Sequence, residues 1–209
     1  MLKRIVFVVI GFFILNSINA QIEGQAHEIG VSIGGGLSFE LTYKRGTPKS
    51  LFRLRSVLFN LNNSRVPNSS TNKYTAGLFG GYERRANIAK YLKFVYGFDL
   101  GASYNGQTSE GNENNVEIEN KEHVITPSIN LVLGINYVLK DQWIFSLELL
   151  PYLSYGFRFT DRRIIQQGIE QIESSVSHFI HGGLNTKAVR LGVAYRFVGK
   201  KKKSKKVKG

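Results

Sequence analysis

The residue types best suited to catalysis gather near the C-terminal end of the chain. A serine hydrolase needs a serine nucleophile, a histidine within hydrogen-bond reach and an acid that orients the histidine. Residues of all three types occur in one segment: Glu170, Glu173, Ser174, Ser175, Ser177, His178 and His181. Because such residues are also common in surface segments without a catalytic role, composition alone assigns no catalytic residue here.

Metal and cofactor chemistry finds little support. The carboxylates of one acidic segment are candidate ligands for a divalent ion: Glu110, Glu113, Glu117, Glu119 and Glu122. They lack the Asp/Asn spacing of a calcium loop, which favours solvated charge. Gly34, Gly35 and Gly36 are not followed by the helix that a phosphate-binding loop requires. The absence of cysteine excludes thiolate metal sites and disulfides. We therefore expect no metal site and no cofactor.

The basic character of the chain is concentrated at its ends. The 209 residues carry 28 Lys plus Arg against 15 Asp plus Glu, a net charge of +13. Residues 200–208 hold seven lysines, and Lys3 and Arg4 add two more charges at the start. Between the two ends, positive and negative charges are nearly equal in number. Most of the net charge therefore belongs to the C-terminal tail, and we predict no nucleic-acid partner.

Both termini are predicted to lie outside the folded domain. Residues 1–20 have the charged start, the apolar run Ile5–Leu15 and the small final residue Ala20 of a secretory signal peptide. The apolar run is too short for a membrane-spanning helix, which needs about 20 residues. Residues 199–209 are predicted to form a disordered, solvated, lysine-rich periplasmic tail, with contact to an anionic surface as the alternative.

The intervening residues 21–198 are dominated by alternation with a period of two. In Ala188–Phe197, apolar side chains such as Leu191 and Val193 alternate with small or charged ones such as Arg190 and Gly192. This period indicates β-strands. We predict eight strands, at 28–34, 37–44, 51–61, 74–84, 92–104, 125–137, 143–157 and 188–197, and therefore an all-β domain.

The predicted connections alternate between short turns and long loops. Long loops are expected at 62–72, 105–121 and 160–186, all at one end of the strands. This asymmetry is typical of outer-membrane barrels. The last loop is ambiguous. Its apolar residues recur at a spacing that fits an amphipathic helix, but the flanking strands could instead continue and turn near Gly168.

The orientation of the alternating faces separates a soluble barrel from a membrane barrel. In a membrane barrel the apolar face points outward and the charged residues point inward, where opposite charges can pair. The residues expected inside are Glu40, Arg53, Arg55, Glu83, Lys93, Asp99, Glu148, Arg190 and Arg196. Since an eight-stranded barrel is filled by its own side chains, we expect these charges to have a structural role.

Aromatic residues on the apolar face fall near the two strand ends, as in the interfacial girdles of membrane barrels. The predicted girdle consists of Tyr43, Tyr74, Tyr82, Tyr104, Tyr137, Trp143, Tyr155, Tyr195 and Phe197. Pro127 and Pro151 lie on the same face and cannot donate to a strand ladder. Because turn alignment places them on adjacent strands at nearly the same height, we expect a bulge or weak pairing there.

These features together resemble the small outer-membrane β-barrel families of Gram-negative bacteria, in particular the "outer membrane protein beta-barrel domain" sequences. The resemblance rests on the signal segment, the eight alternating strands, the loop asymmetry and the closing strand Val189–Phe197 with its aromatic end. It implies an eight-stranded, antiparallel, up-and-down transmembrane β-barrel with a polar packed interior. It also implies outer-membrane localisation after cleavage near Ala20, contact with membrane lipid and lipopolysaccharide, and recognition by the barrel-assembly machinery.

The functional hypothesis is a non-catalytic outer-membrane protein that serves membrane anchoring, envelope integrity or surface interaction. Segments 105–121 and 160–186 are the candidate contacts for an extracellular ligand. One alternative is a barrel-rim enzyme that modifies lipid A or phospholipid, but the His-x-Ser-Asn pattern of lipid A deacylases follows none of His123, His178 and His181. A further alternative is a soluble, lipocalin-like periplasmic barrel that binds a ligand.

Overall fold

The fold is built from antiparallel β-strands. The structure is a computed structural model that describes residues 25–34, 38–66, 69–113, 116–166, 169–184 and 188–198. Within these ranges the strands are β1 (Ala26–Gly34), β2 (Ser38–Thr47), β3 (Ser50–Val66), β4 (Ser69–Asn87), β5 (Leu92–Glu113), β6 (Val116–Leu139), β7 (Trp143–Leu149), β8 (Tyr152–Gln166), β9 (Ile169–Gly183) and β10 (Val189–Val198). The predicted signal segment 1–20 and tail 199–209 lie outside the described residues.

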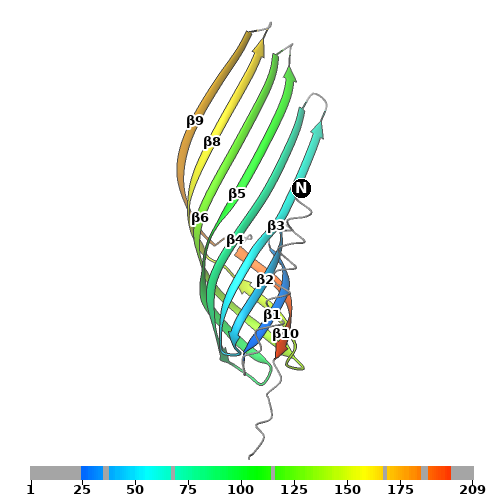
Figure 1. Cartoon of the computed structure of the whole chain (residues 1–209), viewed down its shortest axis with the longest axis vertical. Coiled ribbons are helices and arrows are strands. Elements are labelled where there is room, and N and C mark those ends of the chain that lie inside the picture. Colours follow the sequence, from blue (N-terminus) through cyan, green and yellow to red (C-terminus); the bar gives the residue numbers. More distant parts are fainter. Residues whose placement is uncertain are drawn as a thin grey trace, which may run out of the picture.

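Eight of the strands close into a ring. Strands β1 to β7 pair in sequence order, β7 pairs with β10, and β10 pairs with β1 to complete the circle. The closing ladder runs from Ala26 opposite Val198 to Gly34 opposite Arg190 without a register shift. The ring forms the lower half of the molecule in Figure 1. The prediction of an all-β antiparallel fold is confirmed, and eight strands make up the ring.

Two further strands belong to a tall extension of the sheet. The upper part of β6 pairs with β8, and β8 pairs with β9, so that β3, β4, β5, β6, β8 and β9 form a six-stranded sheet above the ring. This sheet is the upper half of the molecule in Figure 1. The prediction of long loops at 62–72, 105–121 and 160–186 is wrong, because strands occupy most of these segments. For 160–186 the helical alternative is also wrong, whereas the alternative of continued strands is confirmed, since β8 continues to Gln166 and β9 begins at Ile169.

The break between β7 and β8 occurs at a proline. Both strands keep the same register against β6, with Leu133 opposite Leu149 and Asn130 opposite Tyr152. Between them, Leu150 donates its backbone N–H to Ala188, whereas the carbonyl of Pro151 accepts from Leu131, each at 2.8 Å. Both β7 and β8 therefore pair with β6 on one side. On the other side, β7 pairs with β10, whereas β8 pairs with β9.

The other proline interrupts the ladder between β6 and β8. The pairing is continuous from Val116 to Ile125 and resumes at Ser128, which leaves out Thr126 and Pro127. The register is the same on both sides, so the weak pairing expected here is present without a bulge. The register shift of this sheet lies elsewhere, between Val57 and Asn60 of β3.

Alternation places opposite chemistry on the two sides of the ring, because successive strand residues face opposite ways. On β5, for example, Phe98 and Leu100 are exposed on the outside, and Asp99 between them is completely buried inside. The apolar face therefore points outward, which contradicts the lipocalin-like alternative. Among the described residues, no helix has the length and apolar character needed to span a membrane.

Candidate functional site

The interior of the ring holds a continuous network of ionised side chains. They come from every strand of the ring except β6, and all of them occupy inward positions of the alternation. We define the interior charge network as Glu28, Glu40, Lys44, Arg53, Arg55, Glu83, Arg85, Asp99, Glu148, Arg190 and Arg196. Six cations thus face five carboxylates in a space from which water is largely excluded.

Arg53 stands at the centre of this network. Its Nη1 atom donates to Glu83 at 3.1 Å and its Nη2 atom donates to Glu148 at 2.9 Å. Its Nε atom lies 3.1 Å from Oδ1 of Asp99, an ion pair that lacks hydrogen-bond alignment. Lys44 links Glu83 and Glu148 from the other side, at 2.8 and 3.2 Å. One guanidinium thereby joins β3 to three other strands.

Two branches leave this centre. Toward the extension, Arg55 bridges Asp99 and Glu40 at 3.3 and 3.2 Å, and Arg190 reaches the same Glu40 oxygen at 2.8 Å. Arg55 also lies over the ring of Phe79, 4.2 Å from its centroid. Toward the other end, Arg85 contacts Glu83 and Glu28, and Glu28 accepts a second charged hydrogen bond from Arg196. Each carboxylate is therefore held by at least one cation.

Glycine makes the room that these long side chains need. Gly97 lies opposite Glu83, and Gly81 lies opposite Asp99, both on the inner face. A Cβ atom at Gly97 would overlap the carbonyl oxygen of Tyr82 and lie 2.8 Å from Cα of Glu83. A larger residue at either position would displace a member of the interior charge network.

A small cavity lies beside the network among the residues that the structure describes. A cavity of about 20 Å³ borders Lys44, Glu148 and Arg190. Such a volume holds about one water molecule. The packed interior thus has the dimensions of a structural core, and the arrangement favours bracing of the ring over conduction.

The nine residues expected inside occupy three kinds of position. Seven are buried members of the interior charge network: Glu40, Arg53, Arg55, Glu83, Asp99, Glu148 and Arg196. Arg190 lies at the rim, where its side chain is 14% exposed beside Glu40. Lys93 is only partly buried near the short-turn end and forms no ion pair with any residue that the structure describes. It keeps the inward register that was expected, opposite the buried Asn136, but lies outside the interior charge network.

Sequence reasoning missed three members of the network: Glu28, Lys44 and Arg85. Each continues the inward alternation at the end of a predicted strand, since Arg85 follows Glu83 by two positions and Lys44 follows Glu40 by four. The signal was present, because Glu28 and Lys44 are terminal residues of the predicted strands 28–34 and 37–44, and Arg85 lies one residue beyond the predicted strand 74–84.

The outer surface of the ring is a broad apolar band. Leu131 on β6 is 54% exposed, and its neighbours above and below on the same face are Ile129 and Leu133. Other exposed members of this outer apolar band are Ile29, Val31, Ile33, Phe39, Phe52, Leu78, Phe98, Leu100, Ile135, Phe145, Leu147, Leu153, Val189, Leu191 and Val193. An apolar surface of this extent marks a site of interaction with another protein or with a membrane.

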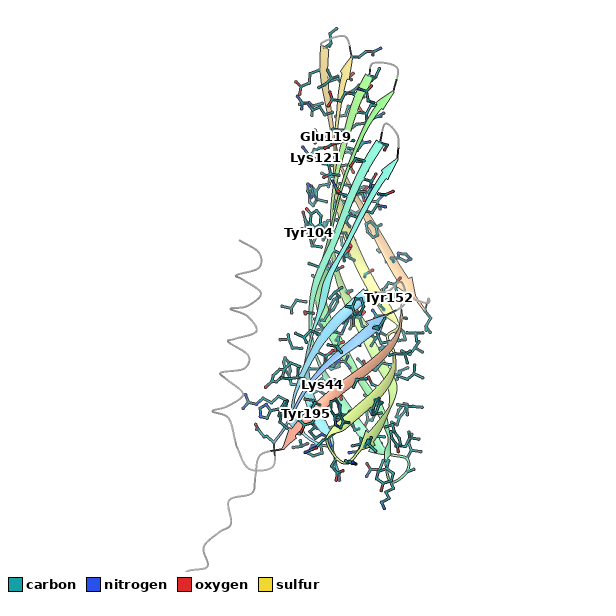
Figure 2. The ribbon with its side chains drawn as sticks, turned by 90° about the vertical axis from the view of Figure 1, so that its right-hand side faces the viewer. Lys44, Tyr104, Glu119, Lys121, Tyr152 and Tyr195 are labelled. Atoms are coloured by element: carbon teal, nitrogen blue, oxygen red, sulfur yellow. The ribbon has the colours of Figure 1, made fainter. Side chains whose placement is uncertain are left out.

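Aromatic side chains mark the lower edge of the outer apolar band. Trp143 and Tyr195 meet edge to face at 5.1 Å, and Tyr195 also packs against Phe197. Nearby, Tyr137 packs against Tyr91, and Tyr82 hydrogen-bonds Ser50. Tyr43 hydrogen-bonds His27 on the adjacent strand. Figure 2 places Tyr195 close to the lower end of the ring.

A second aromatic level lies higher. Tyr74 and Tyr104 are 3.2 Å apart at their hydroxyl groups, and the Tyr104 hydroxyl lies 2.7 Å from Nδ1 of His123. On β8, Tyr155 packs against Phe157. Figure 2 shows Tyr104 far above Tyr195. At about 3.3 Å per residue and a tilt of about 40°, β5 rises about 25 Å between Phe94 and Tyr104, which matches the apolar band of membrane barrels.

The residues considered for catalysis all lie on β9. Ser174 donates to Asp161 on β8 at 2.7 Å. The ring of His178 contacts Tyr155 and Phe157, and the ring of His181 contacts Tyr152. Within the described part of the chain, no hydrogen bond joins a serine of this segment to either histidine. Ser175, Ser177, Glu170 and Glu173 are exposed along the same strand.

The acidic residues considered for metal binding are spread along β5 and β6 and do not converge. Glu119 pairs with Lys121 and Glu122 with Arg158, both on the surface. Likewise, Glu170 pairs with Arg163 at 2.7 Å, and this hydrogen bond raises the pKa of the Arg163 guanidinium. No group of three potential metal ligands occurs among the described residues. The arrangement is that of a hydrated, salt-bridged surface.

Comparison with known proteins finds similarity in the fold and none in the sequence families. No protein-family model and no curated protein sequence matches this chain. Among solved structures, a major outer membrane protein from Thermus thermophilus is similar with a TM-score of 0.55 at 12% identity, over 83% of this chain and 99% of that one. This likeness indicates a shared type of fold.

Two further structures match with lower scores. They are Ail, the attachment invasion locus protein of Yersinia pestis (TM-score 0.43, 11% identity, 84% of this chain and 100% of that one), and CarO of Acinetobacter baumannii (TM-score 0.36, 13% identity, 86% of this chain and 99% of that one).

Proposed function

We propose that this chain is a non-catalytic outer-membrane protein whose eight-stranded ring spans the membrane as a β-barrel. The extension of six strands then stands on the outer side, where it serves surface interaction. The outer apolar band would contact membrane lipid and lipopolysaccharide, and the barrel-assembly machinery would insert the chain.

One observation carries this proposal: the polarity of the ring is inverted relative to a soluble protein. Leu131 and its apolar neighbours are exposed, whereas Arg53, Glu83 and Asp99 are at most 1% exposed inside. In water this arrangement would leave the apolar surface exposed and bury charge at high cost. In a bilayer the same arrangement is favourable, and ring closure leaves no open strand edge within the lower part of the band.

Three features agree with this placement. The two aromatic levels resemble interfacial girdles about 25 Å apart. The Thermus outer membrane protein has a similar fold. The extension carries exposed charged pairs such as Glu119 with Lys121, which suits water and not lipid.

Cysteine labelling tests the proposal, because the chain contains no cysteine of its own. Glu117→Cys lies high on the extension, Leu131→Cys lies in the outer apolar band, and Lys90→Cys lies in the short turn between β4 and β5. On intact cells, a membrane-impermeant maleimide should label only the Glu117 variant. Lys90→Cys should react after the outer membrane is permeabilised, and Leu131→Cys only after denaturation. Equal labelling of all three variants in a soluble periplasmic fraction would contradict the proposal.

A further inference from the structure

The last strand of the extension has an open edge. β9 pairs with β8 along its whole length, from Ile169 to Gly183, and no other described strand lies on its opposite side. Every second residue of β9 therefore directs its backbone N–H and C=O away from the sheet. A row of such groups is a template for the addition of another strand.

β9 lacks three of the devices that usually protect such an edge, namely cationic residues, proline and a bulge, and its charged residues are Glu170 and Glu173. Its fifteen residues include no lysine, arginine or proline, and its register against β8 is constant from end to end, so it contains no bulge. The opposite edge of the same extension, on β3, contains a register shift between Val57 and Asn60. Because bulges and cationic residues discourage strand addition, β9 is the edge that remains suited to it.

The apolar residues of β9 are symmetric about its midpoint. Ile172, Val176 and Ile180 share one face at equal spacing and are 65, 60 and 75% exposed. If a second β9 pairs antiparallel with Val176 opposite Val176, Ile172 falls opposite Ile180 at both ends. The same register places Ile169 opposite Gly183, so the two strands overlap completely. Apolar pairs directly opposite one another stabilise antiparallel strands.

Charge also favours the antiparallel register. The antiparallel register places Glu170 opposite Gly182 and Glu173 opposite Phe179, so no carboxylate lies directly opposite another carboxylate. A parallel, in-register pair would instead place each glutamate beside its own copy, and like charges in that position are destabilising. The sequence of β9 is therefore complementary to itself in one direction only.

We propose that β9 is a homotypic docking edge, which pairs antiparallel with β9 of a second copy of this chain about a two-fold axis at Val176. Because the two strands run in opposite directions, the two rings lie at opposite ends of the joined sheet. This step rests on the proposed function: if the rings span outer membranes, the contact connects two facing membrane surfaces, such as those of neighbouring cells or vesicles.

Disulfide trapping tests the register in the full-length, folded protein in detergent. Two cysteines directly opposite each other on antiparallel strands have a Cα separation that a disulfide accepts. Under mild oxidation, Val176→Cys should give a covalent dimer. Ile172→Cys and Ile180→Cys should each remain monomeric alone and form a dimer when mixed. Leu131→Cys, in the outer apolar band, is the matched control and should not cross-link.

Other outcomes overturn the proposal. Self-linking of the Ile172 and Ile180 variants without a mixed product would indicate parallel pairing. Equal linking of all variants, including Leu131→Cys, would indicate random collision, and no dimer with any variant would exclude the edge contact. Mobility of each unheated variant in SDS shows whether its ring is folded. Failure of the barrel can thus be distinguished from failure of the docking edge.

A charge variant tests the contact without oxidation. Val176→Lys places two like charges opposite each other at the axis and should lower the dimer association constant about tenfold or more. Ile169→Lys, which falls opposite Gly183, should leave the dimer intact. Native mass spectrometry of both variants in detergent measures the dimer fraction. An unchanged dimer fraction in Val176→Lys would contradict the proposed axis.

Discussion

Arg85 on β4 and Glu28 on β1 are joined by two parallel hydrogen bonds of 2.7 and 2.6 Å across the interior of the ring. The two strands are not neighbours, since β2 and β3 separate them on one side. The same carboxylate accepts from Arg196 on β10 at 2.9 Å. Glu28 therefore connects the seam where the first and last strands meet to a strand on another part of the wall.

Replacement of Glu28 by glutamine should weaken the ring strongly. The variant leaves Arg85 and Arg196 buried without their shared anion, and such a loss costs about 3–5 kcal/mol in the free energy of unfolding. Urea titration in detergent, followed by mobility on gels, measures the effect. Glu117→Gln, on the exposed surface of the extension, is the control and should change the midpoint little. Equal midpoints for the two variants would refute the bracing role of Glu28.

Arg53 should matter more than Arg190. Arg53→Leu leaves Glu83, Asp99 and Glu148 without their common cation, whereas Arg190→Leu removes a cation from the partly exposed rim. Both substitutions should lower resistance to urea, Arg53→Leu by about 3 kcal/mol or more and Arg190→Leu by about 1 kcal/mol. A larger loss of unfolding free energy in the Arg190 variant would show that Arg53 is not the centre of the network.

Valine should be tolerated on one face of a strand pair and rejected on the other. At Gly97, inside the ring, the side chain would collide with the Tyr82 carbonyl and displace Glu83. At Gly80, on the outer side, the nearest atom to a Cβ is Phe52 Cζ at 3.7 Å. Gly97→Val should cost about 3 kcal/mol or more, and Gly80→Val should change stability by less than about 1 kcal/mol. Urea midpoints compare them, and similar losses in both would argue against the tight interior.

Pro127 is expected to be a weak point in the wall. Pro127→Val supplies a backbone N–H where the ladder between β6 and β8 is interrupted, and a new hydrogen bond contributes about 1 kcal/mol. The variant should unfold at higher urea concentration and show slower amide exchange at Ser128 and Tyr155. Faster exchange at these amides would contradict this interpretation of the gap.

The ring could be predicted from sequence because its two faces differ so sharply. In Val189–Phe197, apolar residues that point outward alternate with small or charged residues that point inward, which fixes both strand and orientation. Most members of the interior charge network follow from the same rule. Glu28 and Lys44 were missed although they are terminal residues of predicted strands, and Arg85 was missed because it lies one residue beyond its predicted strand.

The extension could not be predicted in the same way. Residues 105–113 belong to a regular strand whose two faces are polar, and the apolar side chains of residues 116–121 are limited to Val116 and Ile118. Without a buried face there is no apolar alternation, so the pattern is that of a polar loop. These strands are instead specified by pairing with longer neighbours, as in the ladder from Leu92 opposite Tyr137 to Glu113 opposite Val116. Such pairing is tertiary information.

The central claim is that the β1–β10 seam closes a ring stable enough to stand in a membrane. The most direct test compares the mobility of the protein from an outer-membrane fraction on SDS gels, unheated and boiled. A closed, internally braced ring should resist SDS, run compactly when unheated and slow on boiling, and Glu28→Gln should lower the temperature of that change. Identical mobility before and after boiling, with the protein recovered from the soluble periplasm, would contradict the account.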